Sequence, residues 1–504
     1  MTSVLVCLDS GTTTVKAAAF DMAGRMVSSA QRDNSALRRQ SAVVEQDMAV
    51  TRADAFAVLK ACIAKIEGEV AGIVVTGQGD GLWPLGADMQ PVGHAITWLD
   101  GRCRALTARL QADGEACRVI EAVTGARPTA ASQSLHCVWL AENEPDRLAQ
   151  IAHILRAKEW LFFCLTGELK AEPSAVLPVW GDWRGGQASP AIQEALGLAR
   201  GIELLPELAS IAECRAGLSP DIAGDLGLAA GTPVLLGPGD VQATLIGLGL
   251  GSTPDVTRAS IFGTSAIHAC HLSDPAQMQE KPAGAMIQHY ALGEGYLCFH
   301  PSFNGATLLK HLAAKLAEQP AAAAPSYSSL ILHPFFEPGG ERAPYTTPYA
   351  SGALFGVTAD TSPAEIAWAG REALAFVARK SHEMMNAPEG TLALGGGLAA
   401  DPHFAGFLAT ATGQKVACNT GGDSGLRGLA MIGARFIHGL SQEAVAKDWR
   451  GAPDAWAEPQ CATRDYAESK YRLFVRLIDA IEPFWEAIAD LGDKSRLPMK
   501  DPPR

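Results

Sequence analysis

The sequence predicts an α/β protein that consists of two related halves. Short apolar runs that end in glycine-rich turns alternate with segments of helical periodicity, which indicates mixed or parallel sheets covered by helices. A passage past the midpoint repeats the strand, small-residue turn and strand order of the N-terminus. The length of 504 residues fits two to four domains at roughly 100–200 residues per domain.

The first half is predicted to open with a β-meander and to continue with a helix and a further strand. Its β-branched apolar runs are separated by short turns rich in Asp, Ser and Gly. The predicted elements are strands over 4–8, 12–20, 26–29 and 72–76 and a helix over about 53–67.

The second half is predicted to begin with strands and to end with helices. The predicted elements are strands over 234–236, from 259 and over 391–394, helices over 363–386, 402–412 and 424–438, and an amphipathic helix over about 464–491 that is interrupted near Pro483. We place the domain boundary at Gly247, which divides the chain into residues 1–247 and 248–504. The alanine-rich stretch 320–325 is expected to be a surface connection, and the tail after Leu497 is expected to be frayed.

Composition argues against several classes of protein. Lys+Arg 41 and Asp+Glu 54 give a net charge of -13, so no nucleic-acid partner is expected, because neutralising phosphates requires a basic surface. No apolar run is long enough to cross a bilayer and no basic leader is present, so we expect no membrane association and a cytoplasmic location. The 11 cysteines include no CxxC pair, and residues such as Cys7, Cys62 and Cys164, which have apolar neighbours in the sequence, are expected to be reduced core residues.

Two turns carry hydroxyl groups that suit phosphate oxygens. The first follows Asp9 and contains Thr12 and Thr13, whose backbone N–H and hydroxyl donors can face phosphate while the carboxylate faces magnesium, directly or through water. A solvated hairpin turn is the structural alternative, and no Walker loop occurs. The second turn, Gly263-Thr264-Ser265, has the same place in the other half, and together the two turns would hold a triphosphate from both sides.

Two further motifs suit phosphoryl transfer to a hydroxyl. Asp240 follows a strand and Gly237-Pro238-Gly239, where a carboxylate can accept the proton of an attacking hydroxyl or, alternatively, cap the next helix. The segments 77–81 and 98–102 supply amide, carboxylate, indole and guanidinium groups for a polyhydroxylated ligand. Their structural alternatives are a core position for Trp98 and an ion pair between Asp100 and Arg102.

In this order the motifs resemble the FGGY carbohydrate kinase family, over nearly the whole chain. They are Leu8-Asp9-Ser10-Gly11-Thr12-Thr13, Gly77-Gln78 with Trp98-Leu99-Asp100-Gly101-Arg102, Leu165-Thr166-Gly167-Glu168, Leu205-Pro206-Glu207-Leu208, Gly239-Asp240, Gly263-Thr264-Ser265, Gly340-Glu341-Arg342-Ala343-Pro344-Tyr345 and Gly395-Gly396-Gly397. The resemblance implies two ribonuclease-H-like domains, the superfold of actin, hexokinase and Hsp70, with ATP and sugar in the cleft between them.

The resemblance also implies a role for individual residues, with ATP and Mg²⁺ as cofactors. The implied roles are catalytic base for Asp240, first phosphate loop for Thr12 and Thr13, magnesium site for Asp9, second phosphate loop for Thr264, nucleotide pocket for Gly305 and Gly397, the adenine side for Asp401, and substrate contacts for Gln78, Gly79, Asp80, Trp98 and Asp240.

Departures from the family pattern concern the substrate. Where this chain has Gln78-Gly79-Asp80, the pattern of glycerol kinases resembles Gln-Arg-Glu. Val241 also stands where glycerol kinases have a glutamine after the catalytic acid, so glycerol is disfavoured as the substrate. At the same position the pattern of xylulokinases resembles Gln-Met-His-Gly. The methionine and histidine are missing from this segment of the chain, which also disfavours ordinary D-xylulose. The Gly-Gln-Gly-Asp-Gly pattern resembles erythritol-kinase-like members. The segment 172–178 departs from the usual Asp-x-Ser-Asp-Ala-Ser, which leaves that wall of the pocket undefined.

These inferences predict an ATP-dependent carbohydrate kinase. It would transfer the γ-phosphoryl group of MgATP to a hydroxyl of a small open-chain sugar or polyol, either a ketopentose such as a xylulose or a tetritol or pentitol such as erythritol. A sugar-sensing ATP-binding regulator without turnover is the first alternative, and an ATP-binding chaperone or filament protein is the second. The resemblance leaves a homodimer open.

Overall fold

Six strands form the sheet of the N-terminal half in a computed structural model that describes residues 3–274, 281–316, 324–337, 340–421 and 423–495. In spatial order they are β14 (Arg215–Gly217), β15 (Pro233–Leu236), β6 (Glu69–Gly77), β1 (Ser3–Ser10), β2 (Thr14–Asp21) and β3 (Met26–Asp33). β1 to β3 form the predicted meander, whereas β6 and β15 lie parallel to β1. The carboxyl ends of these three parallel strands therefore meet at one edge of the sheet.

The sheet of the C-terminal half repeats this arrangement. In spatial order its strands are β18 (Met286–His289), β19 (Tyr296–Ser302), β17 (Ala266–Leu272), β16 (Val256–Phe262), β22 (Thr391–Gly396), β23 (Val416–Cys418) and β24 (Ala455–Ala457). β16, β17 and β19 form an antiparallel meander, β22 and β23 continue parallel to β16, and β24 is an antiparallel edge. Apart from β18, the order and directions match the first sheet, which confirms the predicted relation between the halves.

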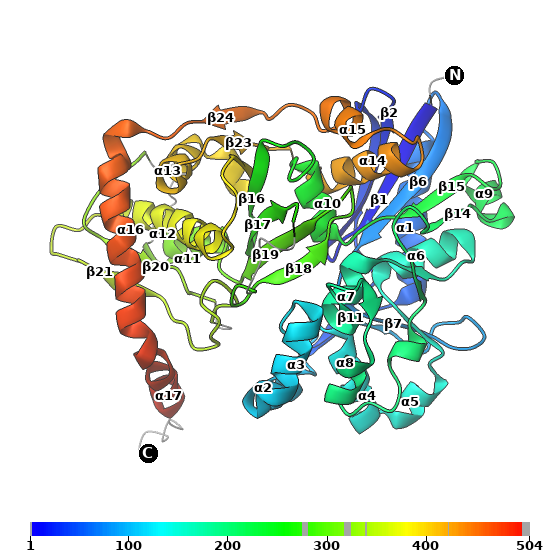
Figure 1. Cartoon of the computed structure of the whole chain (residues 1–504), viewed down its shortest axis with the longest axis horizontal. Coiled ribbons are helices and arrows are strands. Elements are labelled where there is room, and N and C mark those ends of the chain that lie inside the picture. The colour runs from blue at the N-terminus through cyan, green and yellow to red at the C-terminus, as the bar shows by residue number, and fades with distance from the viewer. Residues whose placement is uncertain (1–2, 275–280, 317–323, 338–339, 422, 496–504) are drawn as a thin grey trace, which may run out of the picture.

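A large insertion lies between β6 and β15. Its strands β7 (Gly81–Leu85), β8 (Ala95–Thr97) and β9 (His153–Leu155) share a small sheet with β4 (Leu37–Gln40) and β5 (Val43–Gln46). Figure 1 shows most of its helices gathered beside one end of the N-terminal sheet. The helices are α2 (Arg104–Asp113), α3 (Glu115–Thr124), α4 (Gln133–Asn143), α5 (Pro145–Gln150), α6 (Ala157–Thr166), α7 (Pro173–Trp180), α8 (Pro190–Ala195) and α9 (Pro220–Leu226).

Two helices that follow corresponding strands join the halves. α10 (Asp240–Gly247) follows β15 and α14 (Ser424–Phe436) follows β23, and the two helices lie against each other (Figure 1). Their backbones approach closely, because a Cβ atom added at Gly428 would lie 1.8 Å from the Ala243 carbonyl oxygen. One apolar core includes Leu5 of the first sheet, Ala393 of the second and Leu429 of α14. The domain boundary at Gly247 stays a prediction, since this core is shared by both halves.

The remaining predicted helices form close to their expected bounds. They are α1 (Met48–Ile63), α12 (Pro363–Met384), α13 (Pro402–Thr412), α16 (Cys461–Ile481) and α17 (Trp485–Ser495). The structure adds α11 (Thr307–Leu316), which was not predicted. α1 begins before the predicted residue 53, because Asp47 caps it by accepting from Ala49 N and Val50 N. A short 3-10 turn that contains Pro483 separates α16 from α17, as predicted. The tail after Leu497 and most of the stretch 320–325 lie outside the described residues.

The cysteines and the helices agree with a globular chain. Nine of the 11 cysteines are buried, Cys7 and Cys62 among them as expected, whereas Cys164 is only half-buried and Cys461 is exposed. Across the ranges that the structure describes, every helix is too short or too polar to span a bilayer.

Candidate active site

Asp240 lies where β15 ends and α10 begins. It is the first residue of α10, the N-cap is Gly239, and its Oδ1 accepts from Val241 N at 2.9 Å. The half-buried carboxylate faces the glycine-rich loop after β6, since a Cβ atom added at Gly79 would lie 3.6 Å from Asp240 Oδ1. The structure thus does not support the alternative that Asp240 is a helix cap.

Three carboxylates share this edge of the sheet. Desolvation, followed by the negative charges of Asp9 and Asp80, raises the pKa of Asp240 to about 7. Desolvation also raises the pKa of Asp9, to about 6, against the opposing charge of Lys16. The pKa of Asp80 is raised by desolvation, which the charges of Arg156 and Arg342 partly oppose. Neighbouring acids with raised pKa values are typical of acid–base sites and of cation sites.

Asp9 has the features of a magnesium ligand. Its Oδ1 atom is buried and has no hydrogen-bond partner, which is costly unless a cation or water reaches it. Magnesium bound with a nucleotide needs one or two protein carboxylates, because phosphate oxygens and water supply the other ligands. Within the described part of the chain no group of three or more His, Cys, Asp or Glu side chains is arranged to hold a metal alone. The donor set therefore fits a metal that arrives with ATP.

The first predicted phosphate turn connects β1 to β2 and contacts a predicted substrate residue. Gly11 N donates to Thr14 O at 3.1 Å, which closes the turn and leaves Thr13 exposed. Trp98 Nε1 donates to Thr12 Oγ1 at 2.8 Å. Trp98 is 40% exposed, so its alternative interpretation as a core residue is wrong.

The second predicted phosphate turn connects β16 to β17, at the corresponding position of the other half. Gly263 N donates to Ser265 O at 2.9 Å, and Thr264 is exposed. Gly305 lies directly against this turn, since an added Cβ would approach the Ser265 carbonyl to 2.4 Å. Gly397 is also exposed but has no atom within 4 Å of an added Cβ, so its surroundings are open.

Three other candidates have partners within the protein. Gln78 is buried and donates to Gln46 Oε1 at 2.8 Å, although its own Oε1 has no partner. Asp100 accepts twice from the Arg102 side chain, once from Arg102 N and once from Val44 N, and its pair with Arg102 is the ion pair of the structural alternative.

Asp401 is engaged in the same way. One oxygen caps α13 by accepting from His403 N and Phe404 N, and the other accepts from Arg371 Nε at 2.9 Å. These bonds give both carboxylate oxygens of Asp401 partners within the protein, without a nucleotide. The predicted adenine contact stays a prediction.

Family models match both halves of the chain. The N-terminal domain model of the FGGY family of carbohydrate kinases matches residues 4–247, and its C-terminal domain model matches residues 259–436. The chain belongs to the FGGY family of carbohydrate kinases. The family prediction is thereby confirmed.

Individual relatives agree with this assignment. The FGGY chain is 28% identical to the erythritol kinase of Brucella abortus (strain 2308), over 96% of this chain and 98% of the relative. It is 29% identical to the xylulose kinase of Escherichia coli (strain K12), over 71% of this chain and 74% of the relative. The crystal structure of gluconate kinase from Lactobacillus acidophilus has a TM-score of 0.87 at 20% identity and covers 97% of this chain, with 100% of its own length matched, which confirms the predicted fold.

Sequence reasoning missed a buried network that supports the loop before Asp240 in this FGGY chain. Glu172 caps α7, accepts from Ser174 Oγ at 2.7 Å and pairs with Lys158 Nζ at 2.8 Å. Ser174 Oγ in turn accepts at 2.9 Å from the backbone N of Gly239, the residue before Asp240. The segment 172–178, which departs from the family pattern, thus forms a helix that holds this loop. A glutamate before a proline at a helix start was the available signal.

A second missed group lies in the C-terminal half. Glu341 is buried and accepts from Ser302 Oγ and Asn304 Nδ2, so it fixes the loop that leads to Gly305. Its neighbour Arg342 stacks on the Phe303 ring at 4.1 Å. The charge of Arg342 also acts on Asp80, so residues of both halves contribute to the electrostatic field at the predicted substrate loop.

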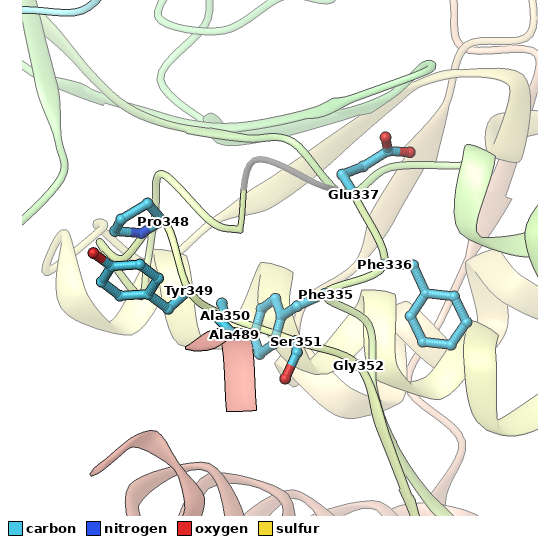
Figure 2. A pocket seen from close by; sticks show the side chains of 9 residues that line it. All are labelled: Phe335, Phe336, Glu337, Pro348, Tyr349, Ala350, Ser351, Gly352 and Ala489. Atoms are coloured by element: carbon cyan, nitrogen blue, oxygen red, sulfur yellow. The ribbon is translucent and has the colours of Figure 1, made fainter. Parts of the chain in front are cut away.

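Two hollows of this FGGY chain are lined by residues other than Asp9, Asp80 and Asp240. One of about 440 Å³ is lined by residues 335–337 and 348–352 and by Ala489 of α17. Figure 2 shows Phe335 and Tyr349 among its side chains. A second of about 230 Å³ lies between α12, α13 and α16. Neither includes Asp240, so we do not assign the reaction to them.

Proposed function

We propose that this FGGY chain is an ATP-dependent kinase that phosphorylates a hydroxyl of a small open-chain polyol or ketose, with erythritol or another tetritol as the first candidate. The observation that carries the proposal is Asp240, a carboxylate with a pKa of about 7 that faces open backbone at Gly79. A base with a pKa near neutrality both takes up a proton efficiently and is substantially ionised at working pH.

In this proposal the substrate hydroxyl binds between Gly79 and Asp240. Asp240 orients the hydroxyl and accepts its proton as the oxygen attacks the γ-phosphorus of ATP. Hydroxyl and backbone N–H groups at Thr12, Thr13 and Thr264 bind the phosphate oxygens, and the nucleotide lies along Gly305 and Gly397. Asp9 holds magnesium, which supplies neutralisation of phosphate charge when it is bound.

Two observations support a short, neutral polyol. The missing side chain at Gly79 leaves room next to Asp240, and Asp80 offers a pure acceptor for hydroxyl donors. A relative that matches this chain over 96% of its length is an erythritol kinase. The division into a sugar-binding domain, 1–247, and a nucleotide-binding domain, 248–504, is part of the same proposal.

A coupled ADP-release screen tests the proposed function. We would compare erythritol, other tetritols, pentitols, D- and L-ketopentoses and glycerol at saturating MgATP. The expected result is polyol- or ketose-dependent ADP release, with a tetritol preferred. Glycerol as the best acceptor would overturn the interpretation of Gly79 and Val241, and no acceptor-dependent release would favour the sugar-sensing regulator.

A further inference from the structure

Arg156 is a buried cation that lacks hydrogen-bond partners. Its side chain is 0% exposed, and no partner is recorded for Nε, Nη1 or Nη2. The Glu159 carboxylate, at 3.7 Å from Nη1, is too distant for a hydrogen bond. Arg102 is the contrast, because its side chain is also buried but donates to Asp100 and to Glu45. A guanidinium shielded from bulk water needs acceptors that are enclosed with it.

The fold places Arg156 beside the substrate loop. Leu155 pairs with Trp83 in the antiparallel ladder of β9 and β7, so Arg156 continues alongside the start of β7. Gln133 Nε2 connects the two segments, since it donates to Leu155 O at 2.8 Å and to Gly81 O at 3.3 Å. Arg156 follows the first of these carbonyl groups and Asp80 precedes the second. The positive charge of Arg156 accordingly opposes part of the rise that desolvation causes in the pKa of the Asp80 carboxyl.

The charges around Arg156 favour a neutral ligand. Lys158 pairs with Glu172 at 2.8 Å and Glu159 lies between both cations, so the buried groups contain no excess positive charge for an anion. A carboxylate on the substrate would also approach Asp80, and the two negative charges would repel each other. A hydroxyl group avoids this repulsion, because it accepts from a guanidinium and donates to a carboxylate at the same time.

We propose that Arg156 is a substrate-binding residue that determines specificity: with Asp80 it binds a hydroxyl of a neutral polyol or ketose that is not the hydroxyl being phosphorylated. This inference rests on the proposed function and adds to it the class of acceptor, a polyol rather than a sugar acid. Arg156 supplies the donors, Asp80 supplies the acceptor, and a substrate that lacks this hydroxyl leaves both groups unsatisfied.

The test compares Arg156→Gln and Arg156→Lys with the wild type, using the best acceptor from the screen and its monodeoxy analogues. The wild type is expected to discriminate at least about 100-fold in kcat/KM against one analogue. In Arg156→Gln, kcat/KM for the parent acceptor should fall about 30- to 100-fold and discrimination against that analogue should shrink to about threefold or less. Arg156→Lys keeps the positive charge but lacks the paired N–H donors of the planar guanidinium. Its kcat/KM and its discrimination ratio should lie between those of the wild type and Arg156→Gln.

Arg102→Gln is the matched control, a buried arginine of the same insertion whose partners are protein carboxylates. Arg102→Gln should lower the melting temperature but retain the discrimination ratio. If Arg156 had only a structural role, Arg156→Gln would give the same result as this control. An Arg156→Gln variant with wild-type kcat/KM and discrimination, or a wild type that prefers aldonates to polyols, overturns the inference. Absence of acceptor-dependent ADP release in the wild type would instead overturn the proposed function. If Arg156→Gln does not fold, Arg156→Lys decides on the same ratio.

Discussion

At the scale of single residues, the account depends on how one aspartate differs from its neighbours. Asp9, Asp80 and Asp240 lie at adjacent strand ends, and desolvation raises the pKa of each. Asp9 has an unpartnered oxygen suited to a cation, Asp80 lies near two arginines, and Asp240 faces open backbone at Gly79. The different surroundings support the proposed metal, substrate and base roles of three residues of the same type.

The first prediction concerns the pH dependence of catalysis. Asp240 accepts a proton only when ionised, so kcat/KM for the acceptor should rise with pH and level off above its pKa of about 7. Ionisation of Asp9, with a pKa of about 6, should steepen the acid limb. Initial rates at fixed free magnesium measure this profile. A flat profile between about pH 5.5 and 8 would contradict the assignment of the base.

The second prediction concerns stability. Because the folded-state pKa of Asp240 is raised from 3.8 to about 7, the folded state binds this proton more tightly, and the stabilisation from the proton is lost as pH rises across that interval. Asp240→Asn should therefore stabilise the ligand-free protein by about 1–2 kcal/mol at pH 8 and by less at pH 5, below the full value of the shift because the side chain is partly solvated. Melting temperatures at both pH values measure the difference. An equal or smaller gain at pH 8 would count against the raised pKa.

At the scale of elements, the shape of the turns that are proposed to bind phosphate depends on the residues that pack beneath them. An added Cβ at Gly305 would lie 2.4 Å from the Ser265 carbonyl, whereas none is obstructed at Gly397. Gly305→Ala should displace the second turn, lower the melting temperature and raise KM for MgATP. Overpacking at this position should lower the stability of the protein by about 1–3 kcal/mol. Gly397→Ala should raise KM for MgATP without a change in melting temperature.

These two variants separate the structural and nucleotide roles of the glycines. Thermal unfolding and MgATP saturation curves of both proteins are the measurements. Unchanged KM in Gly397→Ala would remove Gly397 from the nucleotide pocket, and unchanged KM in Gly305→Ala would show that the second turn does not depend on its packing.

Sequence patterns predicted the elements better than the contacts between them. Apolar runs and glycine turns predicted β1, β2 and β22 and the interrupted helix near Pro483, because these signals are local. The hydrogen bond from Gly239 N to Ser174 Oγ and the position of Arg156 beside Asp80 join segments far apart in the chain. No local pattern encodes such contacts, and Arg156 reads simply as the residue before a helix. The site residues at the strand ends were therefore predicted from the sequence, whereas the residues that support them or lie beside them, such as Ser174 and Arg156, were not.

At the scale of the whole molecule, two similar halves meet through α10 and α14. A Cβ added at Gly428 would lie 1.8 Å from Ala243 O, so Gly428→Ala should separate these helices. We expect a loss of about 1–3 kcal/mol or more in stability and reduced kcat, because Asp240, the proposed base, begins α10. Gly224→Ala in α9 is the matched control, since no atom lies within 4 Å of its added Cβ, and it should be neutral or stabilising by about 0.5–1 kcal/mol. Thermal unfolding and steady-state rates decide, and equal behaviour of the two variants would contradict this view of the interface.

The net charge of -13 acquires a clearer meaning at this scale. It argued against a nucleic-acid partner, yet MgATP is also anionic and must be recruited against the overall field. Backbone N–H groups and hydroxyls at the two turns, one from each half, are local donors that do not change the net charge. A duplicated turn thus offers a way for an acidic chain to bind a triphosphate.

The central claim is that Asp240 is the base of a polyol-dependent phosphoryl transfer, and the most direct measurement is acceptor-dependent ADP release by the wild type and by Asp240→Asn, with MgATP affinity measured on both proteins. The account predicts that Asp240→Asn loses about 10²–10⁴-fold in kcat while it binds MgATP as the wild type does. Asp240→Asn with wild-type turnover, or with turnover and MgATP binding lost together, would contradict it.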